Sequence, residues 1–238
     1  MNQEKEQEMR IAQFLTALTV MIGSSLTASL AQEMKYLPLS EYMMPQDAEG
    51  ALAKSAAPRG ISDRATIETL TASGYQVAHQ GDNGFVCLVM RGFTVAPTFA
   101  PAQMRTLIVY DAKTRAPICF DPNAARTVLP YYELRTKLGL EGKSPDEIAT
   151  AVQAAYAKNE IPKREDVSFA YMWSADQVLG PAGHWHPHMM LFVPYYQNSM
   201  LGDNSPASHL PFVGDDAGTP FAVAVIPVDD KLAVSAHQ

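Results

Sequence analysis

Three of the six histidines stand at alternate positions in one short segment, as His184, His186 and His188. In an extended backbone alternate side chains project from one face, about 6.5 Å apart, so these imidazoles could converge on one point. Neutral imidazole is the commonest transition-metal ligand, and three imidazoles with an open coordination position would suit Zn or Cu. The spacing therefore predicts a candidate metal site, with His209 or an aspartate from residues 203–216 as a fourth ligand.

Packing is the stronger interpretation of the same segment. Pro187 lacks an N–H and restricts the backbone of His186, so the segment can turn and direct its imidazoles apart. Trp185 and Pro187 would then pack at the entrance to an apolar strand, and the acidic residue of patterns such as HxHxDH is missing. Met189 and Met190 follow, and thioethers favour Cu(I), but methionine commonly fills cores and no Met-x-x-Met repeat occurs.

Sequence patterns of common catalytic sites are missing: G-x-S-x-G, H-E-x-x-H, the P-loop and G-x-G-x-x-G do not occur. Ser174, with Asp176 close by, has no assigned base and is weak evidence for a nucleophile. The tyrosine pairs at 131–132 and 195–196 could line a pocket, although amphipathic packing is preferred. The following carboxylates are interpreted as caps, turns and solvated surface: Asp121, Asp146, Glu147, Asp229 and Asp230.

The strands that would position these residues are short and bounded by turn-forming residues. They are expected at 66–70, 75–78, 85–90, 106–110, 117–122, 167–173, 189–193 and 221–228. Gly74 and the run at 81–84, Gly-Asp-Asn-Gly, are typical of tight hairpins. Residues 65–90 are therefore expected to form an antiparallel meander.

Helices are expected in the middle of the chain. Residues 124–138 have a helix-forming composition, and Pro130 should break or kink that helix. Residues 145–158 are the best helical candidate, because Ser144 can cap the helix and Glu147 completes a capping box.

Strands that flank this helical insert, at 124–158, predict an α+β fold with a mostly antiparallel sheet. One domain is expected over residues 61–238. Residues 32–60, with a short helical candidate at 47–56, form an N-terminal extension that packs onto it. The Gly/Pro/Asp-rich segment 201–220 is long for a loop, so it is expected to be mobile or part of a site.

Residues 11–31 carry no charge and close with Ser-Leu-Ala, a pattern typical of a signal peptide cleaved after Ala31. The first ten residues sum to −1, whereas signal peptides begin with positive charge, and a start at Met9 removes this conflict. The segment is long enough for an uncleaved membrane anchor, although six Ser and Thr residues interrupt it. A cytosolic helix is a further alternative. After cleavage no stable membrane span is expected.

Cys87 and Cys119 are the only cysteines. In an oxidising compartment this even count favours one disulfide, which would close a loop of roughly 32 residues and contribute on the order of 3 to 4 kcal/mol. Two separate buried thiols are the alternative, because Cys87 lies within an apolar run and free cysteine is a good core residue. No CxxC motif indicates a redox site or a zinc ribbon.

The composition describes a folded domain and excludes several classes of partner. The chain has 238 residues, of which 47% are hydrophobic and 18% charged, unlike disordered or fibrous sequences. Its formal net charge is −7, so no general attraction to nucleic acid or anionic lipid is expected.

Four segments, NGFVCL at 83–88, APICFDP at 116–122, AYM at 170–172 and GHWHPHMM at 183–190, resemble a family of uncharacterised exported bacterial proteins. The resemblance covers roughly residues 46–200. It implies export to the periplasm or secretion, and a single domain, with no activity, cofactor or catalytic residue to transfer. The function expected is a non-catalytic binding or envelope-associated domain. The alternative is a metal-dependent (Zn or Cu) enzyme or metal-binding protein that uses His184, His186 and His188.

Overall fold

A computed structural model describes residues 35–96, 98–99, 106–164, 167–180, 183–214 and 216–236. Contacts within the chain divide it into two units, Met1–Lys35 and Tyr36–Gln238, and the second contains the fold. The predicted signal peptide at 1–31 and the start at Met9 lie outside the described residues. Among the described residues, no helix combines the length and apolar character needed to cross a membrane.

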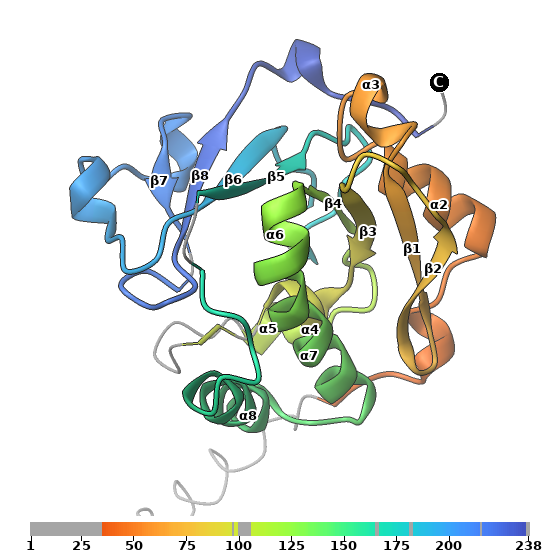
Figure 1. Cartoon of the computed structure of the whole chain (residues 1–238), viewed down its shortest axis with the longest axis horizontal. Helices are drawn as coiled ribbons and strands as arrows, with labels where there is room; N and C mark the ends of the chain where they lie inside the picture. The colour runs from red at the N-terminus through yellow and green to blue at the C-terminus, as the bar shows by residue number, and fades with distance from the viewer. Residues whose placement is uncertain are drawn as a thin grey trace, which may run out of the picture. The chain divides into compact units, whose positions relative to one another are not determined.

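In the described part of the chain, eight strands form one sheet in the order β2-β1-β3-β4-β5-β6-β8-β7 (Figure 1). Only β1 and β3 pair in parallel, and the other neighbouring strands pair antiparallel. Together with the helices, this sheet confirms the α+β prediction. The strands are β1 Thr66–Thr71, β2 Gly74–His79, β3 Val86–Met90, β4 Ala116–Phe120, β5 Ser168–Met172, β6 His188–Phe192, β7 Phe212–Val213 and β8 Val223–Pro227.

In sequence order, α2 and α3 precede the first strand, and α4 to α8 lie between β3 and β5. The α-helices are α2 Gln46–Lys54, α3 Arg59–Ser62, α4 Gly92–Val95, α5 Thr106–Val109, α6 Pro122–Thr127, α7 Leu129–Leu140 and α8 Pro145–Ala157. Short 3₁₀ helices are η1 Leu39–Glu41, η4 Asn198–Leu201, η5 Pro206–Ser208 and η6 Asp230–Leu232.

Local sequence signals account for the boundaries of α6, α7 and α8. The predicted capping box is present on α8, where the Ser144 and Glu147 side chains each bond the other residue's backbone N–H. Pro130 lies in the first turn of α7, where its missing N–H costs no hydrogen bond, so the expected helix divides into α6 and α7 at Val128. The side chain of Asp121 caps α6 by accepting from the Ala124 N–H, as its interpretation as a cap predicts.

Residues 65–90 do not form the predicted antiparallel meander. β2 lies outside β1, and the chain then crosses back so that β3 pairs in parallel with the other edge of β1. Gly81 permits this crossing rather than a hairpin, because a Cβ there would lie 2.3 Å from backbone atoms of Arg64, Ala65 and Thr66. Gly81 is therefore needed because two backbone segments approach closely at this position.

The strand predicted at 106–110 is wrong, because this segment forms the short helix α5. It packs beside α4, where Gly92 allows close approach: a Cβ at that position would lie 2.1 Å from the Ile108 carbonyl oxygen. A short apolar run has no periodicity that separates a strand from a buried helical turn. The two-residue strand β7 also lies within the segment 201–220 that was expected to be a loop.

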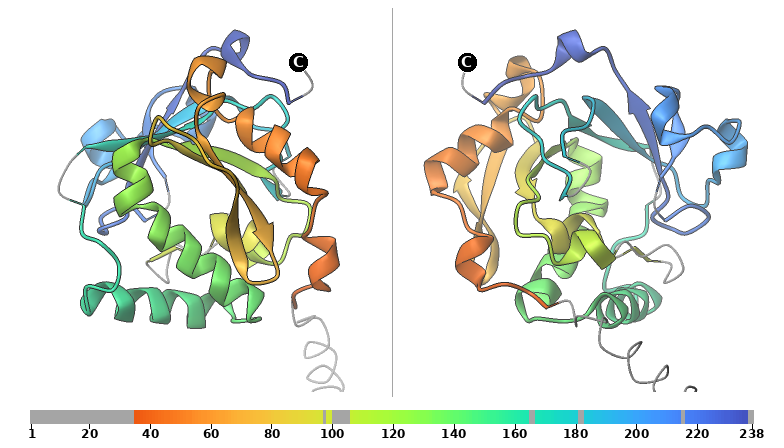
Figure 2. Two further views of the ribbon diagram at one scale, coloured as in Figure 1. Left: turned by 45° about the vertical axis from the view of Figure 1, so that its right-hand side comes forward. Right: turned by 180° about the vertical axis from the view of Figure 1, so that it is seen from behind.

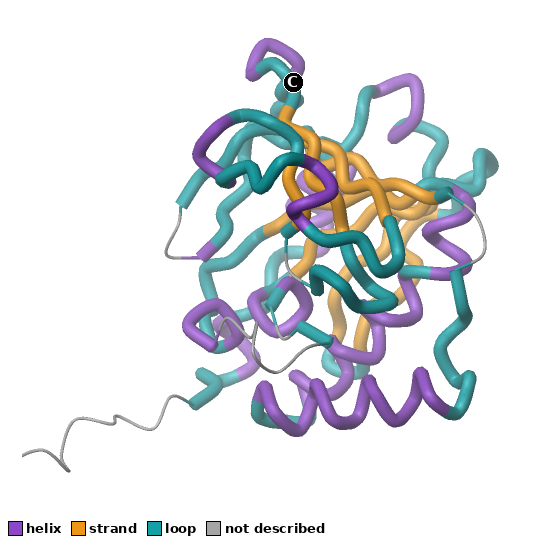
Figure 3. Tube along the Cα trace, turned by 90° about the vertical axis from the view of Figure 1, so that its left-hand side faces the viewer, coloured by secondary structure: helices purple, strands orange, loops and turns teal. Residues whose placement is uncertain are grey.

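Helices cover both faces of the sheet (Figure 2). On β3, Cys87 and Val89 pack with Leu52 of α2, whereas Leu88 and Met90 belong to the larger core that includes α7 residues. Successive strand residues face opposite sides, so these two cores lie on opposite faces of β3. The segment with η4 and η5 lies against β7 at the far edge of the sheet (Figure 3).

Candidate functional site

The histidine segment divides its three imidazoles between different surroundings. Only His188 belongs to β6, where it pairs with Met172 of β5 and Pro227 of β8. His184 is exposed, the His186 side chain is 34% exposed, and His188 is buried. Within the described part of the chain, no group of three His, Cys, Asp or Glu side chains is arranged to hold a metal ion.

His188 is a neutral hydrogen-bond acceptor at its free ring nitrogen. Its Nδ1 lies 2.8 Å from the His186 carbonyl oxygen, and a carbonyl can only accept, so Nδ1 carries the proton and Nε2 the lone pair. Burial lowers the pKa of His188 to about 4, which keeps the imidazole uncharged at neutral pH. The ring also packs edge-on against Trp185, with 4.6 Å between centroids.

Gln177 holds the backbone of the histidine segment in place, and no sequence pattern indicated this role. Its side chain is buried, and Nε2 donates to the carbonyl oxygens of Trp185 and His186, at 2.7 and 3.0 Å. The His186 carbonyl thus accepts from both Gln177 and His188. These hydrogen bonds hold the backbone that leads into β6 in one conformation.

His186 instead faces an acidic partner from the end of the chain. Its Nδ1 lies 2.8 Å from Oδ1 of Asp230, and its ring lies 4.2 Å from that of His209. The hydrogen bond from His186 lowers the pKa of Asp230, and the charges of His209 and His184 act in the same direction. The Asp230 side chain is 67% exposed, as expected for a surface residue, but it is also paired with His186.

A cavity of about 470 Å³ lies on the His188 side of the sheet. His188 and Met190 alternate along β6 and so face the same side. The lining is mostly apolar and includes Met90, Leu179, Trp185, Met190, Phe212 and Val225. Its polar members include Arg135, His188, Asn198, Asn204 and Asp216. The cavity thus brings together parts of the chain that are distant in sequence: the helices α4, α5 and α7, the strands β3, β5, β6 and β8, and the segment from η4 to β7.

Arg135 of α7 is the buried cation of this cavity, with 2% of its surface exposed. Its Nη2 donates to the carbonyl oxygens of Val95 and Ala96, at 2.7 and 2.6 Å. The guanidinium carbon lies 4.7 Å from the ring centre of Tyr131 and 5.3 Å from that of Tyr132. Its Nε is fully buried and has no acceptor among the described residues.

Asp216 and Tyr131 form a second polar contact beside the cavity. The Tyr131 hydroxyl donates to Oδ2 of Asp216 at 3.0 Å, and the Phe99 N–H donates to Oδ1. Tyr131 stacks on Phe221 with 4.0 Å between ring centres, and burial raises its pKa. Of the two tyrosine pairs considered from sequence, Tyr132 lines the cavity, whereas Tyr195 and Tyr196 are exposed and are not among its lining residues.

Ser174 has the surroundings of a structural residue. It is fully buried, its Oγ lies 2.6 Å from that of Ser55, and it accepts from the Asp176 N–H. Asp176 in turn accepts from the Ala236 N–H at 2.8 Å. A nucleophile needs access to substrate, so the weak sequence signal at Ser174 reflects packing of the C-terminal segment.

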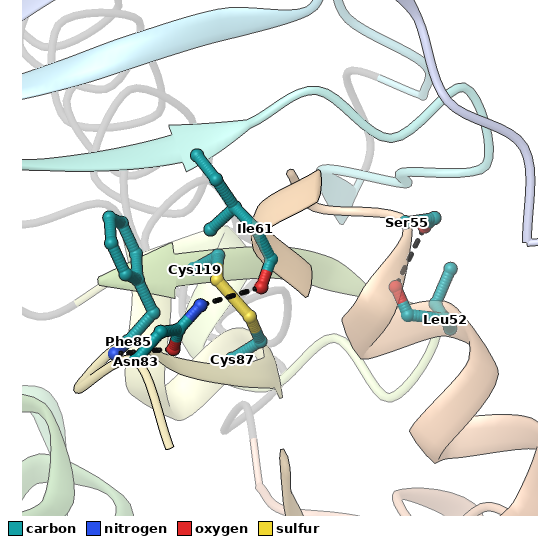
Figure 4. The surroundings of a disulfide bond; sticks show 7 residues. All are labelled: Leu52, Ser55, Ile61, Asn83, Phe85, Cys87 and Cys119. Carbon is teal, nitrogen blue, oxygen red and sulfur yellow. Dashed lines mark hydrogen bonds between the residues drawn. A yellow bond between two sulfur atoms is a disulfide. The ribbon is translucent and has the colours of Figure 1, made fainter. Parts of the chain in front are cut away.

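The predicted disulfide joins Cys87 of β3 to Cys119 of β4 (Figure 4). The two residues are direct partners in the antiparallel ladder, and both are fully buried. Asn83 closes the loop beside them: its Nδ2 donates to the Ile61 carbonyl and its Oδ1 accepts from the Phe85 N–H. The disulfide lies in the core under α2, away from the cavity residues.

Comparisons with known proteins give no relative for this site: no protein-family model, curated protein or solved structure matches the chain.

Proposed function

We propose that this chain is an exported, non-catalytic binding protein whose cavity holds a small and largely apolar molecule. The observation that carries the proposal is the cavity of about 470 Å³, apolar over most of its lining and supplied with a few buried polar groups. Ligand sites in proteins commonly have this size and this composition. A structural core of the same residues would pack without such a space.

Export is supported by the buried disulfide, because such bonds persist in oxidising compartments and are rare in the cytosol. The metal-dependent alternative has less support. His188 is buried on the cavity side and donates to a carbonyl, whereas His184 is exposed and His186 pairs with Asp230. A common ion would need this segment to rearrange against its contacts with Gln177.

Binding of a neutral, environment-sensitive probe tests the proposal. N-phenyl-1-naphthylamine carries no charge and fluoresces strongly in apolar surroundings. We expect a saturable increase in fluorescence with the folded protein, at one probe per chain. A response that rises linearly, or that persists after unfolding in urea, would contradict a defined cavity.

A glycine in the lining allows the cavity to be filled. A Cβ at Gly214 would lie 3.5 Å from Val225 and 3.7 Å from Phe212, in ordinary contact, so Gly214→Leu would direct its side chain among lining residues. We expect this variant to weaken probe binding about tenfold or more. Gly60→Leu is the matched control, because no atom lies within 4 Å of its Cβ position and Gly60 is not a lining residue. Equal probe affinity in both variants would place the probe elsewhere.

A further inference from the structure

Arg135 is a permanent charge in a place where charge is costly. A guanidinium stays protonated in proteins, and moving it from water into an apolar interior is unfavourable unless its N–H groups are satisfied. Two carbonyl oxygens and two tyrosine rings compensate part of this cost. Nε contributes a buried donor without an acceptor among the described residues, and such donors are rare in folded proteins.

The carboxylate of Asp216 does not fill that role. Both of its oxygens accept other hydrogen bonds, from the Tyr131 hydroxyl and from the Phe99 N–H. Arg135 donates to the carbonyls of Val95 and Ala96 instead. Arg135 is a lining residue, so its guanidinium is the cationic group that an anion bound in the cavity would meet.

The rest of the lining specifies the body of a ligand. Met90, Leu179, Val223 and Val225 offer apolar surface, which favours an alkyl or aromatic group. His188 adds an uncharged acceptor at Nε2, so it does not compete with Arg135 for an anion. Among the described residues, the lining holds one cation, Arg135, and one carboxylate, Asp216, whose two oxygens already accept hydrogen bonds. Arg135 is therefore the lining group that is complementary to a molecule with one anionic end.

This reasoning rests on the proposed function and identifies its ligand class. We propose that the cavity binds a small monocarboxylate amphiphile, with the carboxylate on Arg135 and the apolar body against the strands. A planar carboxylate matches the fork of a guanidinium, and hydrogen bonds between ionised groups are roughly twice as strong as neutral ones.

A head-group series on the unaltered protein is the primary test. Octanoate, octan-1-ol and octyltrimethylammonium share one alkyl chain, and each competes with bound N-phenyl-1-naphthylamine in a displacement assay. We expect octanoate to displace the probe at a concentration about tenfold or more below that of octan-1-ol. The ammonium compound should be the weakest competitor. Hexanoate should bind more weakly than octanoate, by about fourfold for each methylene removed.

The outcomes separate the two proposals. If octan-1-ol competes as well as octanoate, the cavity binds apolar molecules and the assignment of a carboxylate to Arg135 is overturned. If neither N-phenyl-1-naphthylamine nor octanoate binds, by fluorescence and by titration calorimetry, the proposed function fails as well.

Replacing the guanidinium tests its role directly. In Arg135→Met, octanoate should lose its advantage over octan-1-ol, while the affinity for octan-1-ol stays within about twofold. Arg126→Met is the matched control, because Arg126 lies on α6, is not a lining residue and, among the described residues, bonds to Asn123. Retention of the octanoate preference in folded Arg135→Met would overturn the proposal. Because Arg135 also holds two carbonyls, a variant that does not fold leaves the head-group series to decide.

Discussion

His188 shows how burial changes the chemistry of one residue. An imidazole whose pKa falls from 6.5 to about 4 on folding binds its proton more weakly in the folded protein than in the unfolded chain. Stability from this residue is therefore complete above about pH 6.5 and is lost as the pH falls toward 4. The total effect is on the order of 3 kcal/mol. Urea denaturation at pH 7 and at pH 4.5, with NMR titration of the imidazole, measures it.

His188→Asn separates this titration from the hydrogen bond, because the amide can still donate to the His186 carbonyl. We expect the variant to lose part of the difference in stability between pH 7 and pH 4.5. His79, which is exposed, supplies the control: His79→Asn should leave the difference unchanged. If the imidazole of His188 in the unaltered protein titrates near pH 6.5, this result would contradict a buried, neutral His188.

At this scale the sequence identified the histidines but could not arrange them. Convergence of residues 184, 186 and 188 required an extended backbone over the whole segment, and β6 begins only at His188. Asp230, the partner of His186, is 44 residues away, and Arg135 reaches the cavity from α7. No local pattern predicts such contacts, because packing of the whole sheet creates them.

At the scale of elements, the helix α2 is held to the sheet by a buried ion pair. Arg91 donates to Glu49 at 2.8 Å, and neither side chain is more than 1% exposed. Arg91 also donates to the Tyr42 and Val89 carbonyls, while Glu49 accepts from the Leu70 N–H. These contacts link residues 42–49 to β1 and β3, which explains why the segment expected as an N-terminal extension forms part of the core.

Breaking this ion pair should destabilise the fold strongly. In Glu49→Gln the Arg91 charge stays buried without its counterion, so we expect a loss of about 3 to 5 kcal/mol in the free energy of unfolding. Urea denaturation measures the loss, and Glu49→Leu with Arg91→Met should cost less than the sum of the single changes. Asp82→Asn breaks the exposed pair with Arg64 and should cost far less, because solvent screens that pair. Similar losses in both single variants would contradict the structural role of Glu49.

Elements that depend on neighbouring residues were predicted correctly from the sequence, whereas elements that depend on contacts with distant segments were not. The capping box at Ser144 and the break before Pro130 depend on neighbours within four residues, and both are present. The strand assigned to 106–110 failed because its helix is stabilised by α4, through the close approach at Gly92. The hairpin predicted at Gly81 was wrong for the same reason. Glycine is required there by the close approach of a distant backbone segment, and not by a local turn.

For the whole molecule, the disulfide joins β3 to β4 in the half of the sheet that packs against α2. Cys87 and Cys119 enclose α4 and α5 in the loop between β3 and β4, at a sequence separation of 32. Closing this loop restricts the unfolded chain more than the folded one, so the bond stabilises the fold chiefly through the unfolded state. The cavity is lined by residues of β3, β5, β6, β7 and β8. Its β3 residue, Met90, belongs to the larger core, whereas Cys87 belongs to the core on the opposite face, so the sulfur atoms do not line the cavity.

Removing the disulfide should therefore lower stability while leaving the cavity intact. We expect Cys87→Ala with Cys119→Ala to lose about 3 to 4 kcal/mol of unfolding free energy, measured in urea, and to keep its affinity for N-phenyl-1-naphthylamine within about twofold. Dithiothreitol should destabilise the unaltered protein and leave the double variant unchanged, since it has no bond to reduce. Native protein whose two thiols react with iodoacetamide before reduction would contradict both the bond and the export that it supports.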